Sequence, residues 1–288
     1  MNDQHIESAS LVPESARLGR FVVLEGTCSL GNHTEVGHHS IVGSGAIMGQ
    51  RTRIGSFVEI DADVRIGSGC LIGSHVRIHA GTQIGDNVRI DDGVTVGKQP
   101  MRAANSAVTK DQHNEPALIG SGCLLGTGVV LYAGSVLGEN VLVADLATIR
   151  ENVNVGDFTI IGRGVAIENK CAVGRYCKLE TNAYIAAYST LEDRVFVAPG
   201  VLTSNDNFLG RTEERFKHFK GATVRRGGRL GVGAVVLPGC DIGSDAVVAA
   251  GAVMTQDADD RVVYAGVPAR RLRDVPQEQL LDEQGWEG

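Results

Sequence analysis

Aliphatic residues return every six positions over most of the chain. A step of six reaches an aliphatic side chain each time in three runs, Ile6–Val96, Ile119–Val197 and Val224–Met254. All 36 positions in these runs are Ile, Leu, Val or Met. Neither the helical period nor the two-residue alternation of an ordinary strand fits this spacing, whereas short strands joined by turns do.

A second column of small side chains lies four residues after the aliphatic one. Eight consecutive members between residues 40 and 82 are Ser40, Ala46, Thr52, Val58, Val64, Cys70, Val76 and Thr82. Three short strands make one triangular coil, so 36 hexads make 12 coils. The pattern therefore predicts a parallel β-helix whose coils stack at the strand spacing of about 4.7–4.9 Å and bury their interior against their neighbours.

The six cysteines occur in the same small-residue column. They are Cys28, Cys70, Cys123, Cys171, Cys177 and Cys240. A redox pair or a zinc site is the competing interpretation of six cysteines. Because all six occupy an inward column, we expect small buried hydrophobic residues that stay reduced and inert.

The repeat is interrupted twice, and interruptions of a solenoid emerge as surface loops that often carry function. The predicted segments are 1–98 (N-terminal coils), 99–117 (first loop), 118–202 (central coils), 203–223 (second loop), 224–256 (C-terminal coils) and 257–288 (cap and short helical tail). The second loop contains Phe208, Phe216 and Phe219 in a chain with few aromatic residues. This loop is expected either to pack on its own coils or to cross to a neighbouring subunit and wall a cleft.

Composition agrees with a narrow aliphatic interior. The chain of 288 residues is 43% hydrophobic but only 5% aromatic, and it contains 38 glycines. Its net charge of −7 gives no reason to expect nucleic acid or an anionic membrane as partner. No apolar run is long enough to span a bilayer, and the first residues, MNDQHIESAS, lack the features of a signal peptide. A cytoplasmic location is therefore expected.

The repeats resemble those of the hexapeptide-repeat acyltransferases, a group that forms left-handed parallel β-helices and acts as homotrimers. Left-handedness follows from the resemblance alone, since the general preference for right-handed crossovers predicts the reverse. The stretch Val224–Arg273, VRRGGRLGVGAVVLPGCDIGSDAVVAAGAVMTQDADDRVVYAGVPARRLR, is similar to the acetyl-CoA-binding end of this group. The stretch Lys178–Asn207, KLETNAYIAAYSTLEDRVFVAPGVLTSNDN, is similar to the nucleotide-sugar N-acetyltransferases. The coils ahead of them look more like the longer lipid A-type acyltransferases, which leaves the acceptor open.

The resemblance implies acetyl transfer from acetyl-CoA to the amino group of a nucleotide-linked amino sugar, with no metal. Such a reaction needs a neutral amine, a stabilised oxyanion and two substrates held close together. The implied catalytic residues are Asn182, Asp206 and His218, and the implied acceptor-binding residues are Asn205 and Arg211. The residues implied for coenzyme A are Arg225, Arg226, Gly228, Ala234, Ala252, Arg270 and Arg271, with the arginines on its phosphates. A histidine suits a general base because its pKa lies near neutrality.

Each of these residues also has a structural interpretation. Asn182 can be a turn residue, and Asp206 can cap its own loop. The arginines can be ordinary solvated charges. Both interpretations of these residues stay open.

Three other functions compete with N-acetyl transfer. An O-acetyltransferase or a longer-chain acyltransferase has the same fold. A zinc carbonic anhydrase-like protein would bind its metal with histidines, for which His39, His75 and His79 are the candidates. A non-enzymatic repeat scaffold is the third possibility, and failure to bind coenzyme A would support it.

Overall fold

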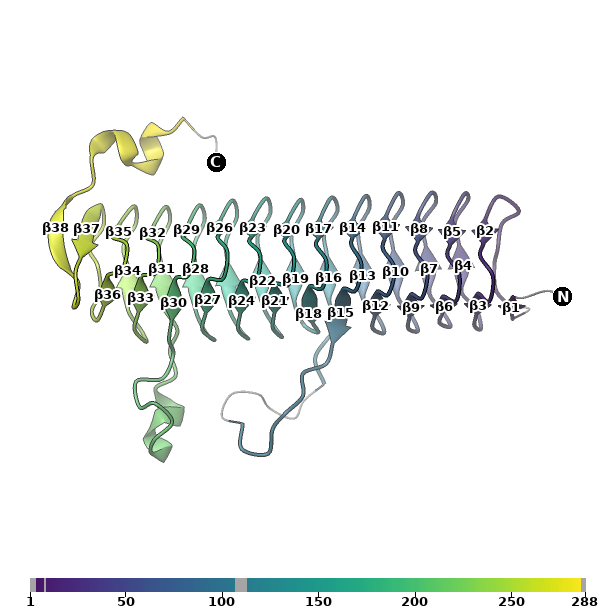
Figure 1. Cartoon of the computed structure of the whole chain (residues 1–288), viewed down its shortest axis with the longest axis horizontal. Helices are drawn as coiled ribbons and strands as arrows, with labels where there is room; N and C mark the ends of the chain where they lie inside the picture. The colour runs from purple at the N-terminus through teal and green to yellow at the C-terminus, as the bar shows by residue number, and fades with distance from the viewer. Residues whose placement is uncertain (1–3, 8, 107–112, 286–288) are drawn as a thin grey trace. The chain divides into compact units, whose positions relative to one another are not determined.

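A computed structural model of the chain describes residues 4–7, 9–106 and 113–285, so part of the predicted first loop, 107–112, lies outside it. The chain divides into two compact units, unit 1 (Met1–Asn152) and unit 2 (Val153–Gly288). Each unit is a stack of three-strand coils whose strands form three parallel sheets, here named A, B and C in the order in which the chain visits them (Figure 1). The predicted all-β parallel β-helix is confirmed, and its coils are consistent with the left-handed form.

The strands of unit 1 are nearly all two residues long. Sheet A contains β1 (His5–Ile6), β3 (Val23–Leu24), β6 (Ile41–Val42), β9 (Glu59–Ile60), β12 (Arg77–Ile78), β15 (Thr95–Lys98), β18 (Val130–Tyr132) and β21 (Thr148–Ile149). Sheet B contains β4 (Ser29–Leu30), β7 (Ile47–Met48), β10 (Arg65–Ile66), β13 (Gln83–Ile84), β16 (Leu118–Ile119) and β19 (Val136–Leu137). Sheet C contains β2 (Arg17–Leu18), β5 (Glu35–Val36), β8 (Arg53–Ile54), β11 (Leu71–Ile72), β14 (Arg89–Ile90), β17 (Leu124–Leu125) and β20 (Leu142–Val143).

Unit 2 repeats the arrangement and adds three short 3-10 helices. Sheet A contains β24 (Ala166–Ile167), β27 (Tyr184–Ile185), β30 (Leu202–Thr203), β33 (Val235–Val236) and β36 (Val253–Met254). Sheet B contains β22 (Asn154–Val155), β25 (Ala172–Val173), β28 (Thr190–Leu191), β31 (Thr223–Val224) and β34 (Asp241–Ile242). Sheet C contains β23 (Ile160–Ile161), β26 (Lys178–Leu179), β29 (Phe196–Val197), β32 (Arg229–Leu230), β35 (Val247–Val248), β37 (Val262–Ala265) and β38 (Arg270–Asp274). The 3-10 helices are η1 (Glu213–Lys217), η2 (Gln277–Gln279) and η3 (Leu281–Glu283).

Strands of successive coils pair in register, so each residue of a strand lies opposite its equivalent in the next coil. Val23 lies opposite Ile41 in this way, and Tyr184 lies opposite Leu202. The paired residues are further apart in the sequence at Gln83 and Leu118, between which the first loop is inserted. They are again further apart at Thr190 and Thr223, between which the second loop is inserted. Both loops leave their unit at the turn from a sheet A strand to the next sheet B strand, here called the A–B corner.

The second residue of most strands and the small residue two positions before it fill the interior. Ile78, Ile149 and Ile185 are fully buried, as are Thr52 and Thr82 of the small-residue column. The six cysteines are all buried, as their column predicted. Burial raises the pKa of Cys177 to about 11 and that of Cys171 to about 12, so these thiols stay protonated at neutral pH.

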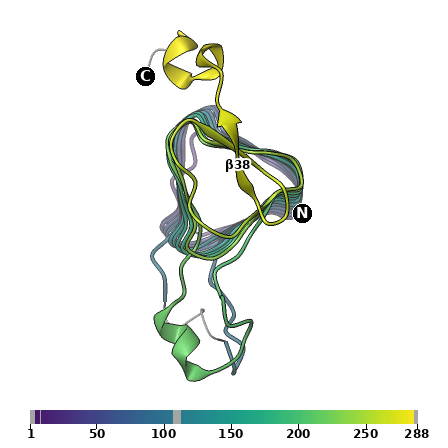
Figure 2. The same cartoon turned by 90° about the vertical axis from the view of Figure 1, so that its left-hand side faces the viewer.

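The C-terminal end of unit 2 is covered by its own chain. Strand β38 pairs antiparallel with β37 and crosses the end of the last coil (Figure 2). The tail then makes two short 3-10 helices rather than a longer helix, because Leu280 and Leu281 are both buried and fix its path. This arrangement leaves fewer unpaired strand edges at the end of the stack.

Strand β23 offers a matched test of the buried column. Ile161 is fully buried whereas its neighbour Ile160 is 38% exposed. We expect Ile161→Ala to lower the free energy of unfolding by about 2–5 kcal/mol, since it leaves a cavity in a closed coil. Ile160→Ala should change it by about 0.5 kcal/mol or less. Denaturant unfolding of both variants measures the difference, and equal losses would contradict the assignment of inward and outward positions.

Candidate functional site

The second loop stands away from the triangular coils of unit 2 between β30 and β31 (Figures 1 and 2). Its neck is closed by a hydrogen bond from the Lys220 amide to the Asn205 carbonyl, 3.2 Å. Asn205, an expected acceptor-binding residue, therefore closes the loop through its backbone. Arg211, the other, lies exposed in the outer part of the loop.

Asp206 organises this loop. Its carboxylate accepts hydrogen bonds from the amides of Phe208 (2.8 Å) and Gly210 (3.0 Å) and from Arg215 Nη1 (3.2 Å). Desolvation acts to raise the pKa of Asp206, but the backbone hydrogen bonds and Arg215 outweigh it and the pKa is lowered. A carboxylate with a lowered pKa is a weak base, so the geometry favours the loop-capping interpretation of Asp206.

His218 lies on the same loop next to a carboxylate. Its Nε2 is 3.1 Å from Glu214 Oε1, and its ring stacks on Phe208 at a centroid distance of 5.7 Å. Hydrogen bonds from Lys217 and His218 hold the pKa of Glu214 below its usual value, which keeps it ionised. When Nε2–H donates to Glu214, Nδ1 carries the lone pair and is the atom that can accept a proton. The side chain is 56% exposed and accessible to a substrate.

Asn182 does not meet this loop within unit 2. It lies at the turn between β26 and β27 with a φ of 59°, a conformation that Asn tolerates. This turn joins sheet C to sheet A and is here called the C–A corner. The second loop follows the neighbouring strand β30 at the A–B corner. Asn182 therefore lies before the strands of sheet A and His218 after them, at opposite ends of these strands. The role of Asn182 stays a prediction that needs another subunit.

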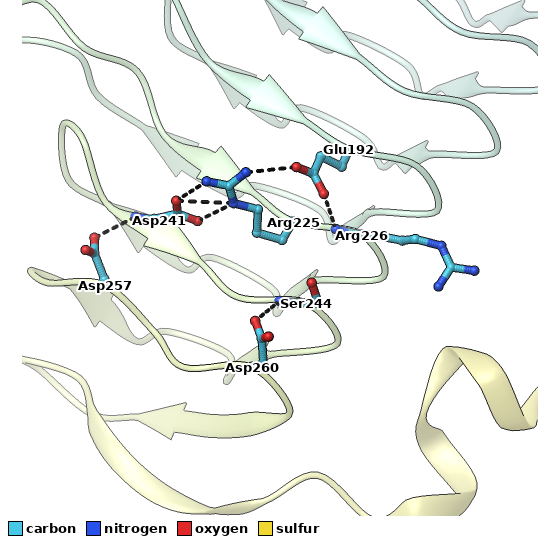
Figure 3. A network of polar contacts seen from close by, with 7 residues as sticks. All are labelled: Glu192, Arg225, Arg226, Asp241, Ser244, Asp257 and Asp260. Atoms are coloured by element: carbon cyan, nitrogen blue, oxygen red, sulfur yellow. Dashed lines mark hydrogen bonds and ion pairs between the residues drawn. The ribbon is translucent and has the colours of Figure 1, made fainter.

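Arg225 is already paired with carboxylates. Its guanidinium donates to Asp241 Oδ1 (2.9 Å) and to Glu192 Oε1 (3.0 Å), as Figure 3 shows. The hydrogen bonds to Asp241 and Glu192 raise the pKa of Arg225. The groove beside it is lined by four aspartates, Asp241, Asp257, Asp259 and Asp260. Binding of a phosphate by Arg225 stays a prediction, and the surrounding negative charge weighs against it.

The other arginines expected at coenzyme A phosphates are more accessible. The Arg226 side chain points away from the Arg225 network (Figure 3) and lies 3.4 Å from Asp282. Arg270 and Arg271 are exposed on β38, where Arg271 pairs with Asp274. Pairing of these three exposed guanidinium groups with phosphates stays a prediction.

The small residues expected to contact coenzyme A face the interior. Gly228, Ala234 and Ala252 are all buried in the small-residue column of their coils. The side chains of Ala234 and Ala252 therefore cannot reach a ligand outside the coil, and Gly228 has no side chain. Only their backbone groups remain available for such a contact.

A second histidine–carboxylate pair occurs in unit 1 and was missed from the sequence. His79 Nδ1 is 3.4 Å from Asp61 Oδ2, and Arg77 Nη2 donates to Asp61 Oδ1 at 2.8 Å. Arg77 also pairs with Glu59. The sequence does contain a pattern that predicts this pair: acidic and basic residues one coil apart, Glu59 with Arg77 and Asp61 with His79. The register of the strands places such side chains next to one another.

This pair lies close to the point where the chain enters the first loop. A methyl group on Gly97, just before the loop, would lie 3.3 Å from the Cβ of His79. At the loop base the side chain of Gln99 exchanges two hydrogen bonds with the backbone of Asn114 (2.9 and 3.0 Å). Burial lowers the pKa of His79, although Asp61 acts in the opposite direction.

The three histidines of the zinc alternative do not converge. His39 and His75 lie at the C–A corner of unit 1, each stacked on Phe57 at 5.0 and 5.1 Å. His79 lies at the A–B corner beside Asp61. In the parts of the chain that the structure describes, no group of three or more His, Cys, Asp or Glu is arranged to hold a metal ion.

Family comparisons match two parts of the chain. Residues 228–256 match the hexapeptide repeat of succinyl-transferase, and residues 56–153 match the GMPPB C-terminal domain. Together with the coils described above, these matches confirm the resemblance to hexapeptide-repeat proteins. Within the described residues, no helix has the length and apolar character needed to cross a membrane.

Two curated relatives are similar over short stretches. A serine acetyltransferase of Buchnera aphidicola is 28% identical over 93 residues, which are 30% of this chain and 34% of the relative. A putative acetyltransferase of Schizosaccharomyces pombe, C18B11.09c, is 41% identical over 49 residues, 17% of this chain and 24% of the relative. The chain therefore spans about a third and a quarter of the length of these relatives.

Solved structures resemble this chain only in part. WeeI from Acinetobacter baumannii has a TM-score of 0.40 at 22% identity, over 47% of this chain and 59% of that one. PerB from Caulobacter crescentus, solved with CoA and GDP-perosamine, has a TM-score of 0.24 at 25% identity, over 55% and 57% of the two chains. Scores this low carry no argument about function.

The lowered pKa of His79 predicts how the stability of the protein depends on pH. The unfolded chain binds a proton at His79 more readily than the folded chain does, so acidification through the unfolded pKa near 6.5 favours unfolding. Stability should therefore fall between about pH 7.5 and pH 5.5. His79→Gln should flatten this fall, whereas His33→Asn, at an exposed turn, should not. Thermal unfolding across this range measures the effect, and an identical pH slope in His79→Gln would contradict the burial of His79.

Proposed function

We propose that the protein is an acetyl-CoA-dependent acetyltransferase that acts on the amino group of a nucleotide-linked amino sugar. The observation that carries the proposal is the His218–Glu214 pair on an accessible loop. This loop belongs to the same unit as residues 228–256, which match the succinyl-transferase repeat. The names of the two curated relatives support an acetyl group as the group transferred.

In this proposal His218 is the general base. Its Nδ1 accepts the proton that the acceptor amine loses as the nitrogen bonds to the thioester carbonyl carbon. Glu214 holds the ring and stabilises the imidazolium that forms. The proton is then returned to the sulfur as the carbon–sulfur bond breaks, so the products are an amide and free coenzyme A thiol.

The residues expected to hold the donor suit its chemistry unequally. Arg226, Arg270 and Arg271 are exposed guanidinium groups that can pair with the phosphates of coenzyme A. Arg225 already has two carboxylate partners and is the weakest of the four candidates. Gly228, Ala234 and Ala252 would contribute backbone groups only.

A homotrimer explains why the proposed residues lie at two corners. In a cyclic trimer each interface joins two different patches, so the C–A corner of one subunit can meet the A–B corner of the next. Asn182 of one subunit would then orient the thioester carbonyl or the amine beside His218 of its neighbour. Asp206 would hold the loop in the conformation that this contact requires, and Asn205 and Arg211, on the same loop, would bind the acceptor.

A hydroxyl acceptor is the second candidate, because one curated relative is a serine acetyltransferase. His218 can deprotonate a hydroxyl in the same way. The two products differ in that hydroxylamine cleaves an ester at alkaline pH and leaves an amide intact. This treatment of the product distinguishes N- from O-acetylation.

Mixed assemblies test the proposed shared site. We expect His218→Asn and Asn182→Ala each to lower kcat, by about 10²- to 10⁴-fold for the lost base. Unfolding and refolding an equal mixture of the two variants should restore up to about one quarter of wild-type activity, because some interfaces then pair two intact residues. Release of coenzyme A thiol from acetyl-CoA with a panel of nucleotide-linked amino sugars measures the activity.

Two results would contradict the shared site. Unchanged turnover in His218→Asn would show that His218 is not the general base. His33→Asn is the matched control for loss of an exposed histidine. Failure of the refolded mixture to exceed either variant, although wild-type protein regains activity by the same procedure, would place all catalytic residues within one subunit.

A further inference from the structure

A cavity of about 340 Å³ lies in unit 2 between sheet C and the C-terminal tail. Its floor is formed by strands β26, β29 and β32, and its wall by η2 and η3. None of the residues expected to bind coenzyme A or the acceptor lines it. Its volume lies in the range of small-molecule sites.

The floor is a column of outward-facing side chains held in register. Lys178 lies opposite Phe196, which lies opposite Arg229, and the next residue in the column is Val247. The spacing between neighbours is that of adjacent strands, about 4.7–4.9 Å. The column therefore presents one aromatic ring between two cations.

The wall is fixed to the same sheet at one edge of the cavity. Leu280 of the tail packs in a buried cluster with Val263 and Val275, against which Val247 also packs. The Leu281 amide donates a hydrogen bond of 3.1 Å to Asp245 Oδ1. The tail is thus anchored at the Val247 end of the column. The cavity lies over the other three residues, Lys178, Phe196 and Arg229.

The cavity contains a cation that lacks a complete set of partners. Nη2 of Arg229 is buried and has no hydrogen-bond partner among the residues described. Nη1 makes a long contact of 3.4 Å to Gln279 Oε1. A buried donor without a partner is costly, and an anion would satisfy it with a charge-assisted hydrogen bond.

The other charges at the cavity leave it with more cations than anions. Lys178, Arg194 and Arg229 line it together with Asp245 and Glu278. An anion is therefore favoured over a cation.

Phe196 is the aromatic ring on which a ligand can stack. Tyr176 also lines the cavity, but Phe158 stacks on one face at 5.0 Å and Arg194 lies over its ring at 4.5 Å. Phe196 remains 37% exposed. A planar ring on Phe196 would place an attached anionic group beside the neighbouring Arg229.

We propose that this cavity binds a planar aromatic anion of mononucleotide size, with its ring on Phe196 and its phosphate on Arg229. The shared chemistry belongs both to free nucleotides and to the adenosine end of a larger molecule. The proposal does not depend on acyl transfer, since it rests on the column, the anchored tail and the unsatisfied guanidinium.

Calorimetric titration of the full chain with AMP tests the proposal. AMP should bind, whereas adenosine and inorganic phosphate should each bind at least about 10-fold more weakly, because each supplies only one of the two contacts. Arg229→Gln should weaken AMP binding by about 10- to 100-fold. Arg273→Gln, an exposed arginine on β38 outside the cavity lining, should leave it unchanged.

Folding of the variant is checked independently. Removing a partly unsatisfied buried cation should leave the thermal midpoint of Arg229→Gln equal to or above that of the wild type. Phe196→Leu provides a second variant that should weaken AMP and adenosine alike. Competition by acetyl-CoA would assign the cavity to the adenosine end of that molecule, and AMP binding without competition would assign it to a separate nucleotide.

Two results would overturn the proposal. One is the absence of measurable heat with millimolar AMP while the protein is folded. The other is AMP binding that survives both Arg229→Gln and Phe196→Leu without loss of affinity.

Discussion

The equal length of successive coils is the constraint on which the structure depends. Because each strand pairs in register with the equivalent strand of the next coil, every side chain lies over the one a coil away. The rings of Phe21, His39, Phe57 and His75 show this directly, since they stack at 4.8, 5.0 and 5.1 Å, about one strand spacing apart. A coil of different length would shift all later columns, so extra residues are accommodated only as loops that leave at a turn and return to the same register.

Much of the fold could be predicted from the sequence because each six-residue repeat corresponds to one strand and one turn of a three-strand coil. Strand β30 was missed because Thr203 stands where the period has an aliphatic residue. The tail was expected to be short and helical, and it forms the two 3-10 helices η2 and η3. Its path depends on the contact of Leu281 with Asp245, which lies 36 residues earlier in the sequence. The period contains no information on such contacts.

The candidate site was less predictable because it lies where the repeat stops. Asp206 was recognised as a possible cap, and its three hydrogen bonds favour that role. The partner of His218 was not foreseen, since Glu214 reaches it only after the loop forms η1. The His79–Asp61 pair could have been found by looking for opposite charges one coil apart.

The repeating and the non-repeating parts of the chain have different tasks. The coils supply rigid columns of side chains, and the second loop supplies the proposed base, His218. Donor binding by unit 2 is the central claim. It is tested most directly by the thermal midpoint of the full chain with acetyl-CoA, coenzyme A or zinc as separate additions. A ligand at one hundred times its dissociation constant stabilises the folded state by about 2.7 kcal/mol, so acetyl-CoA should raise the midpoint clearly. A midpoint that neither acetyl-CoA nor coenzyme A raises, but that zinc does, would contradict the account.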